Sequence, residues 1–147
     1  MKKIFILSFI VMAFTGMGQM PIFKRYYIAD APGMAWSGDF FLTHFIHYLG
    51  AAFFLGFAAY VLTGYVLSGR SHYRLTGPGM TRVFLLAGLV ATGIVRVLKN
   101  LPEVTFSPGF TMLVDISHLG FMMAFLFVAL AFAIFGKGWV KVRDVHN

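Results

Sequence analysis

Four apolar stretches alternate with short polar segments along the chain. They cover residues 4–19, 40–69, 80–98 and 108–136. The second has 30 consecutive residues without Asp, Glu, Lys or Arg, whereas a membrane-spanning helix needs only about 20 apolar residues. The pattern predicts an all-α integral membrane protein, with four transmembrane helices in an up-and-down bundle and a single membrane domain over residues 1–147.

The first apolar stretch has two readings. Lys2 and Lys3 precede it, which is also the layout of a secretory signal peptide, but no small-x-small cleavage site follows. It is therefore either a retained first helix or a cleaved signal. Residues 20–39 combine prolines, mixed charges and aromatic side chains, which predicts a segment lying at the membrane interface.

Composition narrows the class of protein. Hydrophobic residues make up 59% of the 147 residues and charged residues 12%, unlike an ordinary soluble domain. The chain has no Cys, which excludes disulfides, thiolate metal sites, iron–sulfur clusters and a Cys nucleophile. The net charge of +7 is scattered between apolar stretches rather than clustered on one element, so we expect no nucleic-acid partner.

The basic residues predict an orientation in the membrane. If both termini are cytoplasmic and four helices span, the cytoplasmic side carries +7 and the outer side 0, as the positive-inside rule prefers. The cytoplasmic set is Lys2, Lys3, Arg70, Arg74, Arg82, Lys137, Lys141 and Arg143, with Asp144. We therefore expect a multi-pass protein of a prokaryotic inner membrane.

Histidines carry the candidate chemistry, because ionisable groups inside a membrane are costly and usually functional. His44 and His47 lie early in the second stretch, and His118 lies early in the last. Both stretches enter from the outer face. With helix starts near residues 37–39 and near Pro108, His47 and His118 lie about nine and ten residues in, which is ~13 Å for His47 and a similar depth for His118. Two imidazoles at one depth on separate helices are what a six-coordinate b-type haem requires. His47 and His118 are the predicted axial ligands, and His44 is an alternate ligand or a contact to a haem propionate or quinone.

Residues near these histidines extend the hypothesis. Gly50 and Gly120 would let the backbones approach a flat macrocycle. Arg96 is placed either to meet haem propionates or to act as an interfacial anchor. Asp115 has three readings: acceptor of a ligand histidine N–H, proton relay for a bound quinone, or ion-pair partner of Arg96 or Lys99.

Two other functions remain open. Zinc would use the three histidines and Asp115, but the only Glu is Glu103 in a loop and no His-Glu-x-x-His motif is present. A cofactor-free membrane anchor or assembly subunit would use the histidines merely as hydrogen-bonding groups between helices.

The segment Thr43-His44-Phe45-Ile46-His47-Tyr48, with a lone His118 in the last stretch, resembles the membrane cytochrome b subunits of respiratory oxidoreductases. The closest class is the gamma subunit of formate dehydrogenases and the related hydrogenase-type cytochromes. The stretch 18–27 is also similar to short cytochromes of anaerobes that accompany iron–sulfur proteins, and the likeness covers roughly residues 18–136.

The resemblance implies haem b held between the second and fourth helices and electron exchange between a quinone pool and partner subunits. That family generally carries two haems, whereas this chain has no intramembrane His near the cytoplasmic side, so we expect one. The depth of the histidines predicts iron–sulfur or cytochrome partners on the periplasmic side. The chain would then be an electron-transfer subunit rather than a stand-alone enzyme.

Overall fold

A computed structural model describes residues 2–20 and 22–143. The chain divides into two compact units, Met1–Gly69 and Arg70–Asn147. The described residues are almost entirely helical, and four of their helices have 17 residues or more. The all-α prediction is confirmed.

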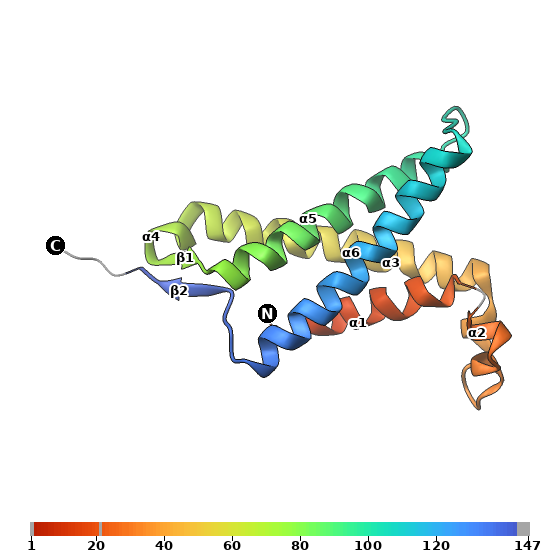
Figure 1. The fold of residues 1–147 in the computed structure, drawn as a ribbon, viewed down its shortest axis with the longest axis horizontal. Helices are drawn as coiled ribbons and strands as arrows, with labels where there is room; N and C mark the ends of the chain where they lie inside the picture. The colour runs from red at the N-terminus through yellow and green to blue at the C-terminus, as the bar shows by residue number, and fades with distance from the viewer. Residues whose placement is uncertain (1, 21, 144–147) are drawn as a thin grey trace. The chain divides into compact units, whose positions relative to one another are not determined.

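The first unit is built on two long helices. α1 (Lys2–Gly18) packs along α3 (Phe40–Gly64), as Figure 1 shows. The predicted interfacial segment between them contains three short helical turns, α2 (Ile22–Arg25), η1 (Ile28–Asp30) and η2 (Ala35–Gly38). These turns are too short to span a membrane and return the chain to the start of α3.

The second apolar stretch is helical beyond its predicted end at residue 69. Asp39 caps the start of α3, because its carboxylate accepts hydrogen bonds from the backbone N–H groups of Phe41 (2.9 Å) and Leu42 (3.1 Å). A π-helical turn, η3 (Tyr65–Gly69), and the short α4 (Arg70–His72) continue the helix. The polar residues that follow residue 69 therefore form helix and then strand.

The second unit is a helical hairpin of α5 (Gly77–Leu98) and α6 (Pro108–Ile134) (Figure 1). Each helix begins at a hydroxyl cap followed by proline in the first turn. Thr76 accepts from the N–H of Gly79 at 2.9 Å, and Ser107 accepts from that of Phe110 at 3.3 Å.

A two-stranded ribbon was not predicted. β1 (Tyr73–Leu75) pairs antiparallel with β2 (Val140–Val142) and ties the start of α5 to the segment after α6. Strands of three residues carry no usable periodicity, and their partners lie more than 60 residues apart. Only the folded hairpin brings them together.

Three helical stretches are long and apolar enough to cross a membrane: Phe40–His72, Gly77–Leu98 and Pro108–Ile134. Large apolar side chains are exposed along them, for example Phe41 at 82% and Ile134 at 72%. A helix that is apolar on every side needs an apolar surrounding. These helices suggest a multi-pass membrane protein, and α1, with 17 residues, is the shortest of the four long helices.

Candidate functional site

In the first unit, His47 of α3 is bonded to Thr15 of α1. The Thr15 hydroxyl lies 3.0 Å from Nδ1 of His47 and 2.7 Å from the carbonyl oxygen of Val11, one turn earlier in its own helix. Thr15 is almost completely buried, at 1% exposure. A hydroxyl that donates its one proton to the Val11 carbonyl can accept the Nδ1–H of His47 on its oxygen.

The glycine after this threonine makes room for the ring. A Cβ built on Gly16 would lie 3.1 Å from Cε1 of His47, closer than an ordinary van der Waals contact. Thr15 and Gly16 thus act together: one holds the imidazole by a hydrogen bond and the other lets it lie against the backbone of α1.

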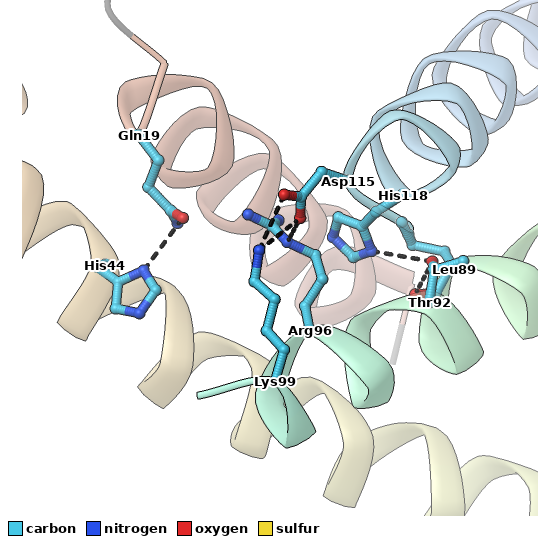
Figure 2. Close-up of polar contacts among 8 residues, drawn as sticks. All are labelled: Gln19, His44, Leu89, Thr92, Arg96, Lys99, Asp115 and His118. Carbon is cyan, nitrogen blue, oxygen red and sulfur yellow. Dashed lines mark hydrogen bonds and ion pairs between the residues drawn. The ribbon is translucent and has the colours of Figure 1, made fainter. Parts of the chain in front are cut away.

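The second unit repeats this arrangement, as Figure 2 shows for its hydrogen bonds. The hydroxyl of Thr92 on α5 lies 3.1 Å from Nδ1 of His118 on α6. It also lies 2.8 Å from the carbonyl of Gly88 and 3.1 Å from that of Leu89. A Cβ on Gly93 would lie 3.2 Å from Cε1 of His118. A Thr-Gly pair therefore receives a histidine ring in each unit.

These contacts are compatible with one tautomer in both rings, the one protonated on Nδ1. With the Nδ1–H donated to threonine, the unprotonated lone pair of each neutral imidazole is on Nε2. A metal-binding histidine normally uses one nitrogen for the metal and gives the other N–H to a protein acceptor. The tautomer protonated on Nδ1 is the one that an Nε2 metal ligand requires.

His44 has a different environment one turn before His47. Its Nδ1 lies 3.2 Å from Oε1 of Gln19, and its ring contacts Phe40 and Tyr48 at centroid distances of 5.4 and 4.3 Å. Figure 2 shows the Gln19 contact. With aromatic rings and a side-chain amide around it, His44 can serve as a polar link between α3 and Gln19, the residue after α1.

Asp115 forms the ion pairs that were one of its three predicted roles. Lys99 Nζ donates to both carboxylate oxygens at 3.0 and 2.9 Å, and Arg96 Nε lies 2.9 Å from Oδ1 (Figure 2). The Arg96 contact is an ion pair without hydrogen-bond alignment. The acceptor at Nδ1 of His118 is Thr92, so Asp115 does not hold that N–H.

The two predicted glycines differ from each other. A Cβ on Gly50 would lie 2.7 Å from Sδ of Met12, so Gly50 lets α1 pack against α3. Nothing lies within 4 Å of a Cβ on Gly120. Neither glycine contacts a histidine ring in the way that Gly16 and Gly93 do.

Within the described part of either unit, no group of three or more His, Asp or Glu side chains is placed to hold a metal ion. The ligand set proposed for zinc is therefore not gathered within one unit. What each unit does present is one histidine held by threonine.

Sequence reasoning missed the four residues that hold the rings. The dipeptide Thr-Gly was available as a signal, but it occurs four times, at residues 15, 63, 76 and 92. Only the packing of helices distinguishes the two copies that face histidines. Comparison of the chain with protein families, with characterised proteins and with solved structures found no match.

Proposed function

We propose that this chain is a b-type haem subunit of a respiratory complex in a prokaryotic inner membrane. It passes electrons between a quinone pool and iron–sulfur or cytochrome subunits on the periplasmic side. The observation that carries the proposal is the pair of threonine-bonded histidines, because a threonine oxygen at Nδ1 can accept the N–H of the tautomer that binds a metal through Nε2. Two such imidazoles are the donor set of a six-coordinate haem b.

In this proposal the chain's own residues hold and orient the ligands. His47 and His118 would bind the iron through Nε2, while Thr15 and Thr92 keep the rings from rotating and keep the proton on Nδ1. Haem, when bound, supplies a one-electron Fe(III)/Fe(II) couple.

The ion-pair cluster of the second unit suits the edge of such a site. Arg96 and Lys99 together carry +2 and Asp115 carries −1, so the cluster retains a charge of +1. A net positive charge complements haem propionates. Because Asp115 is already paired with two cations, its role in this proposal is to position Arg96 and Lys99 rather than to relay protons to quinone.

Membrane topology forms part of the same proposal. Four spans with both termini in the cytoplasm place the start of α3 and the start of α6 on the periplasmic side. His44 would then lie nearest that face as a propionate or quinone contact. The apolar composition of α1 and its packing along α3 support its retention as the first span.

A cofactor-free anchor is the second candidate, and one observation favours it. Both histidines already bond to a neighbouring helix, which is the ordinary stabilising use of an intramembrane histidine. This alternative predicts a colourless purified protein with the same helix packing.

A dithionite-reduced minus oxidised difference spectrum of the purified full chain separates the two candidates. The haem proposal predicts a b-type band in the wild type, its loss in H47A and in H118A, and its retention in H72A, an exposed histidine used as control. A wild-type protein without a visible band, purified from haem-replete cells, would reject the proposal. Metal analysis of the same sample tests zinc.

A further inference from the structure

The β1–β2 ribbon is amphipathic. Its register places Arg74 directly opposite Lys141, while Tyr73 faces Val142 and Leu75 faces Val140. Since side chains alternate between the two faces of a strand, one face carries the two bases and the other carries only apolar and aromatic side chains. All six paired residues of the ribbon are exposed except Leu75, which is half-buried.

Two like charges directly opposite on a ribbon destabilise it. Among the residues that the structure describes, this unit contains two acids, Glu103 and Asp115, in the α5–α6 loop and near the start of α6. The ribbon lies at the other end of the hairpin, where α5 begins and α6 ends. Its charged neighbours in the chain are the bases Arg70, Lys137 and Arg143 and one acid, Asp144, so bases outnumber acids there.

A buried cation adds to the positive charge beneath the ribbon. Arg82 is only 3% exposed, donates from Nη2 to the carbonyl of Lys137 at 3.0 Å, and lies over the rings of Phe132 and Trp139 at 4.9 and 5.0 Å. Its Nη1 has no partner among the described residues. The end of the hairpin is thus strongly positive from the surface inward.

The ribbon also lacks an apolar cover of its own. Val140 is 41% exposed and Val142 is 67% exposed, and a lone two-stranded ribbon is marginally stable in water. Yet it follows directly on the candidate span Phe40–His72 and lies one residue before α5. Its position along the chain therefore brings it to the surface of the membrane that these helices cross.

We propose that the β1–β2 ribbon is a membrane-surface element that binds anionic phospholipid headgroups. Its apolar face lies against the acyl region, and Arg74 and Lys141 extend their charged ends to lipid phosphates, which relieve the repulsion between them. This binding is a property of the hairpin end and does not depend on haem.

Nitroxide labelling of the full chain in lipid nanodiscs tests directly how deep the ribbon lies in the bilayer. The protein has no Cys, so V142C provides one labelling position on the apolar face, and E103C in the α5–α6 loop provides an exposed control. In nanodiscs with phosphatidylglycerol, we expect the label at 142 to collide more often with oxygen than with a water-soluble nickel chelate. The label at 103 should show the reverse order.

The charge requirement is tested by adding R74Q and K141Q to V142C. Each lost base should lower the ratio of embedded to exposed ribbon about fivefold in anionic nanodiscs. Nanodiscs of phosphatidylcholine alone should also lower this ratio for the V142C protein that keeps Arg74 and Lys141. Free phosphate added to the phosphatidylcholine sample should not restore the depth. A chelate-accessible label at 142 in anionic nanodiscs would overturn the proposal and favour a protein partner, and a depth unaffected by lipid charge would overturn the headgroup claim.

Discussion

The two units use the same device to hold a histidine in different electrostatic surroundings. In each, a Thr-Gly pair on the first long helix receives a histidine from the second, with hydroxyl to Nδ1 distances of 3.0 and 3.1 Å. The sequence separations differ, 32 against 26 residues, and no repeat is visible in the sequence. The likeness lies in side-chain geometry rather than in related sequence.

The surroundings of the two rings differ in charge. His118 lies one helical turn after Asp115 and its two cations, whereas the neighbour of His47 one turn away is His44, bonded to an uncharged amide. The rings also lie at different distances from their helix starts, ~10 Å for His47 and ~15 Å for His118. The two histidines therefore share one hydrogen-bond geometry but differ in the charges around them. Each prediction below tests either the shared geometry or the difference in charge.

The largest effects are expected for the histidines themselves. H47A and H118A should each abolish the b-type difference band, because one remaining imidazole leaves the iron without its second axial ligand. Retention of the band in one of the two variants would show that the units are not equivalent and would remove that histidine from the site.

Larger side chains at Gly16 and Gly93 should have the next largest effect on haem content. A valine at Gly16 or Gly93 would place atoms inside the volume of the ring, since even Cβ lies 3.1–3.2 Å from Cε1. We expect G16V and G93V to lower the haem content severalfold in a pigment assay normalised to protein. G120A, at a position with open space, is the control and should keep its pigment.

Loss of the threonine hydroxyls should change the redox potential while haem stays bound. T15V and T92V leave the Nδ1–H without its acceptor, which makes the imidazole a weaker donor and disfavours Fe(III). With a hydrogen bond contributing about 0.5–1.5 kcal/mol, we expect the midpoint potential to rise by ~20–60 mV.

The serine variants T15S and T92S keep the hydroxyl and should restore the potential in a spectroelectrochemical titration. An equal shift in serine and valine variants would assign the effect to packing and would reject the role of the hydrogen bond.

The ion-pair cluster tests the asymmetry between the units. D115N removes both ion pairs from a carboxylate that is 38% exposed, so we expect a loss of unfolding free energy below about 1 kcal/mol and an intact haem band. Thermal unfolding and the difference spectrum measure these. If D115N keeps its haem but loses electron exchange with quinol, Asp115 is a proton relay instead.

The smallest effect is expected at His44. H44Q should retain the haem band, because Gln19 and the neighbouring rings hold a polar group there without a role as iron ligand. Loss of the band in H44Q together with its retention in H47A would exchange the roles of these two residues and break the likeness between the units.

Local sequence was sufficient for the helices but not for their partners. Cap residues such as Asp39, Thr76 and Ser107 act on backbone groups within four residues. The starts at 40 and 108 were predicted, whereas the third helix begins at Gly77, three residues before the predicted start of its stretch at 80. The group that bonds each histidine comes from another helix, so the sequence of one helix does not identify it. The similar depth expected for His47 and His118 was likewise calculated along each helix separately.

The sequence by itself determined the all-α class, the long apolar helices and the absence of thiol chemistry, because length, hydropathy and composition act residue by residue. Tertiary structure alone decided which two of four Thr-Gly pairs face histidines, that Asp115 joins Arg96 and Lys99, and that two distant segments form a ribbon. Each of these depends on contacts between residues 16 to 69 positions apart, set by how helices pack rather than by any local pattern.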